Sequence, residues 1–168
     1  MDIKEIIELC SGKWFSQRTI FQTQVESSKS EITVEFLPSD HPEIIKLCQQ
    51  YRIEPELALG GTKASWDNSV DWGKPKQTGY TLLVWVPQAN DPTNGRILRY
   101  LSQGQVSAQG QYTIGTDDAL TLSIEEANLK SEERLWFASP NLRLRTSLVK
   151  LSNGASQMAF YSEIRKVS

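Results

Sequence analysis

The chain has little histidine and little cysteine, with one and two residues in 168. His41 comes just before a proline at the start of an expected helix, so we expect a turn residue there and not a catalytic base. Cys10 and Cys48 lie in helix-like patterns. We expect both to be reduced core residues, with a disulfide or a reactive thiol as the alternatives. Without a Cys-x-x-Cys spacing, we expect no metal site.

The sequence also lacks a strong charge bias, long apolar segments and the motifs of the common enzyme classes. Its net charge of -2 argues against the broad basic surface that nucleic-acid binding requires. No apolar run approaches the roughly 20 residues of a membrane span, and the charged N-terminal residues are unlike a signal peptide. A phosphate-binding loop, a dinucleotide fingerprint and a Gly-x-Ser-x-Gly elbow are missing. We therefore expect a cytoplasmic protein without a membrane span.

What the chain does contain is the composition of an ordinary globular protein, with 39% hydrophobic and 23% charged residues. Its length fits a single domain over 1–168. Residues 2–11 predict a short helix that Asp2 caps and Gly12 ends, because the apolar side chains recur at helical spacing. A second helix is expected over 42–51, where a proline occupies the first turn.

The rest of the sequence is typical of short β-strands, so we expect an all-β fold with two short helices, one of them between the second and third strands. The ten expected strands cover residues 13–25, 30–37, 58–67, 80–87, 96–103, 105–115, 118–126, 132–139, 142–151 and 156–166. Turn residues separate them, for example at 27–29 and 90–95. This spacing favours an antiparallel meander that closes into a barrel, with a sandwich as the alternative. A barrel of this size can enclose one small ligand.

Arginine occurs on strand faces that would line such a barrel. Side chains alternate across a strand, so Arg143 and Arg145 share one face, as do Trp14, Ser16 and Arg18 earlier in the chain. A buried guanidinium needs a partner, and a ligand carboxylate accepts two hydrogen bonds from it. The alternative is that these arginines face water, which is common on one-sided antiparallel sheets.

Tryptophan is plentiful, with five residues. Trp66 and Trp72 lie in an irregular stretch around 66–79, where they would either cover a flat aromatic ligand or pack the barrel mouth. Trp136 lies in the strand before the paired arginines. Four carboxylates beside an apparent turn are expected to form a solvated surface: Glu125, Glu126, Glu132 and Glu133.

Several motifs occur in order over nearly the whole chain. The most specific is the run ERLWFASPNLRLRTS at 133–147. The others are WFSQRT at 14–19, LCQQY at 47–51, ASWDNS at 64–69, DDALTL at 117–122 and SEIR at 162–165. Together they resemble the S/U-type phycobiliprotein chromophore lyases, the CpcS/CpeS/CpcU family.

The resemblance implies a lipocalin-like barrel that forms a single bilin-binding domain. Members of the family bind a linear tetrapyrrole (bilin), such as phycocyanobilin, and deliver it to a cysteine of a phycobiliprotein subunit as a thioether. By resemblance, three arginines are expected to hold the bilin propionates: Arg18, Arg143 and Arg145. Four tryptophans are expected to form the walls: Trp14, Trp66, Trp72 and Trp136. The two cysteines of the chain need not react, because the acceptor protein supplies the thiol.

The chain departs from the family pattern at one place. Many members follow the Arg-Thr pair with a Ser-His-His type stretch, whereas here Arg18 and Thr19 are followed by Ile20 and Phe21. Phe21 cannot transfer a proton, so we expect a U-like member that works with an S-type lyase subunit or as a homodimer. The alternatives are a lyase that acts alone with a different acid, a non-catalytic carrier of a bilin or fatty-acid-like carboxylate, and a structural partner that only stabilises an S-type lyase.

Overall fold

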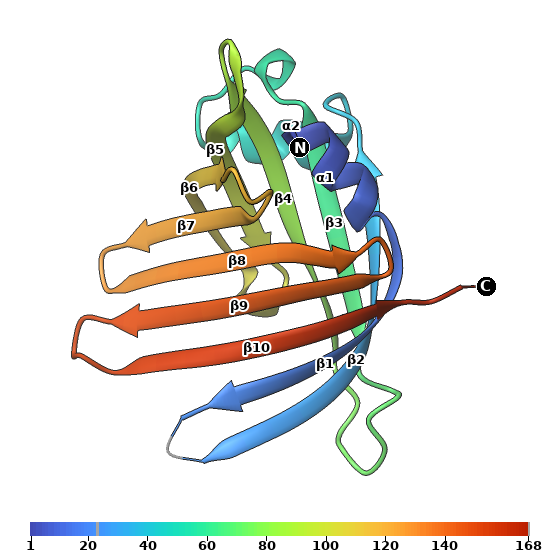
Figure 1. The fold of residues 1–168 in the computed structure, drawn as a ribbon. Coiled ribbons are helices and arrows are strands. Elements are labelled where there is room, and N and C mark those ends of the chain that lie inside the picture. The colour runs from blue at the N-terminus through green and yellow to red at the C-terminus, as the bar shows by residue number, and fades with distance from the viewer. Residues whose placement is uncertain (23, 168) are drawn as a thin grey trace.

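Ten antiparallel strands form a closed barrel in the computed structural model, which describes residues 1–22 and 24–167. The strands are β1 (Gly12–Phe21), β2 (Val25–Leu37), β3 (Gly60–Asp67), β4 (Thr78–Gln88), β5 (Asp91–Leu101), β6 (Val106–Ile114), β7 (Leu120–Glu126), β8 (Leu129–Ser139), β9 (Leu142–Leu151) and β10 (Ser156–Arg165). Each strand pairs with its neighbours in sequence, and β1 pairs with β10 to close the barrel (Figure 1). This confirms the predicted barrel and excludes the sandwich.

Helix α1 (Ile3–Cys10) covers one end of the barrel (Figure 1). Its start is fixed by a capping box, in which the Asp2 carboxylate accepts the Glu5 backbone N–H at 3.0 Å and Glu5 accepts the Asp2 N–H at 2.9 Å. The apolar stripe of the helix packs with Trp14 and other strand residues inside the barrel. Helix α1 therefore fills this end of the barrel in the part of the chain that the structure describes.

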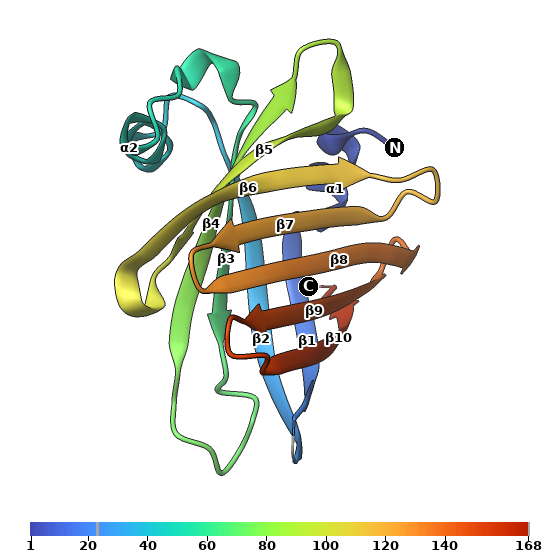
Figure 2. The ribbon, with the colours of Figure 1, turned by 90° about the vertical axis from the view of Figure 1, so that its left-hand side faces the viewer.

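Helix α2 (Pro42–Gln50) packs on the outside of β4 and β5, where it forms a second apolar core (Figure 2). His41 is its N-cap, and the His41 Nδ1 atom accepts the Glu43 backbone N–H at 3.2 Å. The close packing depends on Gly61 of β3, because a Cβ there would lie 2.3 Å from Ile44 Cδ1. Two 3-10 turns, η1 (Pro55–Leu57) and η2 (Gln103–Gln105), complete the helical segments. None of the helices in the described residues has the length and hydropathy of a membrane span.

The predicted element boundaries are confirmed at most positions, and two predicted turns are wrong. Residues 27–29 belong to β2, which begins at Val25, and most of 90–95 belongs to β5, which begins at Asp91. These polar residues stay in strands because neighbouring strands pair with them: β1 pairs with 27–29, and β4 and β6 pair with parts of 91–95. Cys10 and Cys48 are both buried and free, as expected.

Candidate functional site

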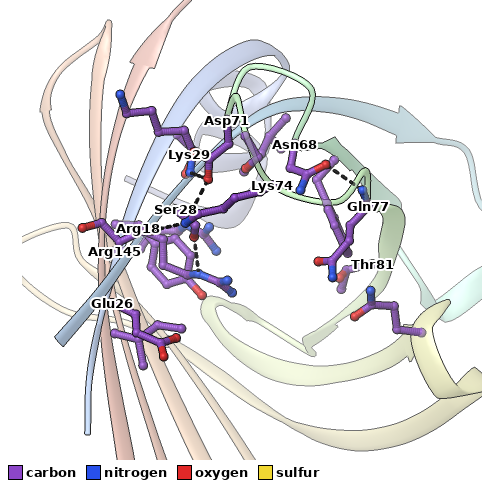
Figure 3. A pocket seen from close by; sticks show the side chains of 18 of the residues that line it. Arg18, Glu26, Ser28, Lys29, Asn68, Asp71, Lys74, Gln77, Thr81 and Arg145 are labelled. Atoms are coloured by element: carbon purple, nitrogen blue, oxygen red, sulfur yellow. Dashed lines mark hydrogen bonds and ion pairs between the residues drawn. The ribbon is translucent and has the colours of Figure 1, made fainter. Parts of the chain in front are cut away.

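A cavity of about 510 Å³ lies inside the barrel at the end opposite α1. Arg18, from β1, and Arg145, from β9, lie on one wall, and Thr81 of β4 lies on the facing wall (Figure 3). The loop at 68–77 and the β1–β2 hairpin extend beyond this end of the barrel (Figures 1 and 2). The cavity is therefore a pocket that opens toward this loop and hairpin.

A buried ion-pair network centred on Glu163 lies on the α1 side of the cavity. The Glu163 side chain is 0% exposed. It accepts hydrogen bonds from Arg143 Nε at 2.8 Å and from Arg145 Nε and Nη2 at 2.8 and 3.1 Å. The register of β9 and β10 brings these groups together, because Arg143 lies directly opposite Glu163. Arg145 also donates to Glu133 at 2.7 Å, so two carboxylates balance the two guanidinium charges.

Burial by itself would raise the pKa of Glu163, because it disfavours the charged form. The attraction of Arg145 and Arg143 outweighs burial and lowers the pKa from 4.5 to about 2. For Arg145, burial opposes the charged form, but Glu163 and Glu133 raise its pKa overall. Glu163 and Arg145 therefore stay ionised near neutral pH.

Arg18 differs from Arg145 because no carboxylate pairs with it in the described residues. Its Nε donates to Ser28 Oγ at 3.1 Å, across the β1–β2 pairing. Arg18 lies next to Tyr161, which in turn lies beside Arg145 and stacks on its guanidinium at 4.0 Å. A hydroxyl partner leaves the Arg18 charge uncompensated, so Arg18 is available to bind an anion.

The tryptophans have different locations. Trp66 lines the cavity. Trp14 is fully buried in the core between Arg143 and Arg165, which lie 4.8 and 4.3 Å from its ring centre. Trp72 is 91% exposed on the 68–77 loop. Trp136 lies on the outer face, because the residues on either side of it in β8 pack into the barrel core.

The seven residues predicted to form one binding wall therefore do not all meet. The cavity brings together Arg18, Arg145 and Trp66. Arg143 and Trp14 lie in the buried core next to the cavity and do not line it. Trp72 is exposed on the 68–77 loop, and Trp136 lies on the outer face of the barrel. Side-chain alternation correctly separates the inner and outer faces, but it does not say how far along the barrel the cavity extends.

Glu133 and Tyr161 are among the cavity residues that were misassigned or missed from the sequence. Glu133 lines the cavity and pairs with Arg145, so its assignment to a solvated surface was wrong. Tyr161 also lines the cavity. Both alternate in phase with the inner face of their strands, which was the available signal.

The 68–77 loop is tied to β2 across the open end. Lys74 Nζ donates to the Ser27 carbonyl at 2.6 Å and lies 3.3 Å from the Asp71 carboxylate. Asp71 also accepts the Lys29 backbone N–H at 3.1 Å (Figure 3). Within the loop, Asn68 brackets the turn by bonding to both Pro75 and Gln77. The loop is thus an ordered part of the cavity rim.

The part of the chain that the structure describes contains no cluster of potential metal ligands. Within residues 1–22 and 24–167, no three His, Cys, Asp or Glu side chains lie together as metal ligands would. The cavity instead combines guanidinium groups, hydroxyls and an indole ring, which suits a conjugated anionic molecule.

Comparison with known proteins identifies the family. Residues 2–166 match the family model described as CpeS-like protein. The chain belongs to the CpeS-like family. It is 44% identical over 169 residues to the chromophore lyase CpcS/CpeS of Thermosynechococcus vestitus, covering 98% of this chain and 93% of the relative. It is 35% identical to the phycocyanobilin lyase subunit CpcS of a Picosynechococcus species, covering 98% and 86% of the two chains.

A solved structure of the same family has the same fold. The S-type phycobiliprotein lyase CPES from Guillardia theta superposes with a TM-score of 0.86 and 29% identity, covering 100% of this chain and 94% of that one. The ten-strand barrel with two short helices is therefore the fold of CpeS-like proteins.

The structure clarifies the one departure from the expected CpeS-like pattern. Phe21 is 45% exposed at the end of β1, whereas Arg18 and Ile20 of the same strand line the cavity. The Phe21 side chain therefore points out of the barrel, next to Val25 and Met158 on the neighbouring strands. A side chain at position 21 therefore lies on the outer face and not in the cavity.

Proposed function

We propose that this chain binds a linear tetrapyrrole such as phycocyanobilin and assists its thioether attachment to a cysteine of a phycobiliprotein subunit. The observation that carries the proposal is the one-ended cavity with an uncompensated arginine, in a chain whose relatives are named chromophore lyases. In this proposal, residues 1–168 act as one bilin-binding domain.

The chemistry of a bilin matches the cavity. Its propionates need positive partners, and Arg18 offers a guanidinium whose only hydrogen-bond partner in the described residues is a neutral hydroxyl. Its conjugated rings need flat apolar surface, which Trp66 supplies. The volume of about 510 Å³ falls in the range of small-molecule sites, roughly 300–1,000 Å³. Arg143 stays a proposed indirect contributor, because it holds Glu163 in place beneath the cavity.

The proposed catalysis is mainly positioning. The acceptor thiol adds across a carbon–carbon double bond of the pigment: sulfur bonds to one carbon, and the thiol proton ends on the other. The barrel would hold the pigment with its reactive end toward the mouth and shield the remainder from water and stray thiols. Since the nucleophile belongs to the acceptor, the buried Cys10 and Cys48 take no part.

The direct test is reconstitution. Purified chain, phycocyanobilin and apo-phycobiliprotein are mixed with and without an S-type lyase, and the covalent adduct is measured by its absorbance and by zinc-stained gels. We expect adduct above the lyase-free background in at least one condition. Arg18→Met should reduce pigment affinity about tenfold. The matched control is Lys13→Met, which removes an exposed cation of the same strand that does not line the cavity. If no condition exceeds the background, the transferase proposal fails.

A second candidate is a lyase subunit that acts only beside an S-type partner or a second copy. The observation that favours it is a row of exposed apolar side chains on the outer face: Phe21, Val25 and Met158, at 45%, 66% and 49% exposure. Adduct formation only when the partner is present, with loss on Phe21→Ser, would select this candidate. Tight pigment binding without rate enhancement in any combination would select a carrier instead.

A further inference from the structure

Arg99 of β5 lies on the cavity wall opposite Arg18. In the barrel order, β5 is separated from β1 by several strands in either direction, so the two arginines approach the cavity from different sides. The register places Arg99 between Leu83 and Ala108, which offer only apolar side chains. Nothing in the sequence motifs of the family resemblance includes this residue.

One nitrogen of the Arg99 guanidinium, the buried Nε atom, lacks a hydrogen-bond partner in the residues that the structure describes. Burial lowers the pKa of Arg99, and the charges of Glu126, Glu133 and Tyr51 only partly oppose that effect. Of these, Glu133 already accepts a hydrogen bond from Arg145. A buried donor without an acceptor is unfavourable for the folded protein, so Arg99 is poorly explained by stability alone.

The arginines at and beside the cavity therefore fall into two groups. Arg143 and Arg145 are balanced by Glu163 and Glu133. Arg18 and Arg99 have no carboxylate partner in the described part of the chain. A ligand with two carboxylates needs two such groups, placed apart.

We infer that Arg99 is a second carboxylate anchor, which binds one propionate of the pigment while Arg18 binds the other. This inference rests on the proposed function, because it assigns the second acidic group of the same ligand. It makes Arg99 a binding residue whose task is to fix how the pigment lies across the barrel. The acidic ligand would supply the acceptor that the buried Nε atom lacks.

The test compares phycocyanobilin with its dimethyl ester, which has the same rings and no free carboxylate. Affinities of the wild type, Arg99→Met and Arg99→Lys are measured by absorbance titration. Arg96→Met is the matched control, because Arg96 lies on the same strand, is exposed and donates to Gln109 at 2.8 Å. We expect Arg99→Met to weaken binding of the free acid about tenfold and to leave ester binding nearly unchanged. Arg99→Lys should recover part of the loss.

Thermal unfolding of the unliganded variants separates binding from folding. If Arg99 is a ligand anchor, Arg99→Met unfolds at the wild-type temperature or above it, since a buried N–H donor without an acceptor is removed. Equal losses for acid and ester, a lower unfolding temperature, or unchanged acid affinity would each overturn the inference and leave the proposed function standing. If the wild type binds neither pigment, the proposed function fails together with the inference.

Discussion

Replacing Glu163 with glutamine tests the buried ion-pair network beneath the cavity. The carboxylate is 0% exposed and bonds to both Arg143 and Arg145. Its pKa of about 2, against 4.5 for an unperturbed glutamate, corresponds at about 1.4 kcal/mol a unit to ~3 kcal/mol of stability at neutral pH. Removing one partner of a buried ion pair typically costs 3–5 kcal/mol, roughly the same size. We expect Glu163→Gln to lower the free energy of unfolding by about this amount, measured by urea denaturation at pH 7.

The pH dependence of that difference has a definite sign. The pKa of Glu163 is lowered by folding, so its contribution is fully present above the unfolded-state value of 4.5. Between about pH 5 and about pH 2 the unfolded chain takes up a proton that the folded chain does not, and the contribution is lost. The difference in unfolding free energy between wild type and Glu163→Gln should therefore be constant from pH 7 to pH 5 and shrink below it.

A matched control is Glu31→Gln. Glu31 pairs with Lys166 at 2.6 Å, but both side chains are more than 40% exposed, at 41% and 46%. Exposed ion pairs contribute little, so this variant should unfold at nearly the wild-type urea concentration. Equal effects of the two substitutions, or a Glu163→Gln difference that does not change with pH, would refute the assignment of Glu163 as the charge that holds the two arginines.

Three further predictions concern the tryptophans and the rim. Trp66→Leu should weaken pigment binding by about tenfold in an absorbance titration, because Trp66 lines the cavity. Trp72→Leu, at a 91% exposed position, should leave binding unchanged. A larger effect of Trp72→Leu than of Trp66→Leu would contradict the location of the cavity. Trp14→Ala should lower the free energy of unfolding by about 3–5 kcal/mol in urea, because it empties a fully buried site. Lys74→Met breaks the bond to the Ser27 carbonyl, and we expect faster pigment release in stopped-flow fluorescence with little change in unfolding temperature; an unchanged release rate would show that this contact does not control the rim.

The fold was largely readable from the sequence because strand and turn signals alternate along nearly its whole length. The limits of both helices and the number of strands followed from apolar spacing and from residues such as Asp2 and Gly12. The misplaced turn at 27–29 shows where this reasoning fails. A serine-rich segment looks like a turn locally, yet it stays in β2 because β1 pairs with it on one side and Lys74 and Asp71 of the 68–77 loop bond to its backbone on the other.

The candidate site was predicted only in part, because partners come from strands whose register the sequence does not give. Alternation placed Arg18 and Arg145 on inner faces. It could not show that Glu163 lies directly opposite Arg143, since that depends on the pairing of β9 with β10. Arg99 was passed over because it lies among Ile97, Leu98 and Leu101 in an apolar strand. Arg99 alternates with Ile97 and Leu101 on one face of the strand, so a charged residue on an otherwise apolar inner face was the signal that would have identified it.

Helix α1 closes one end of the barrel, and this constrains the order in which a ligand binds and is released. A bound pigment would enter and leave the cavity through the same open end, so the protein would release one pigment molecule before it binds another. Free pigment in large excess would then compete with the acceptor protein for the open end of the barrel. The rate of adduct formation should therefore fall, not rise, at high pigment concentration.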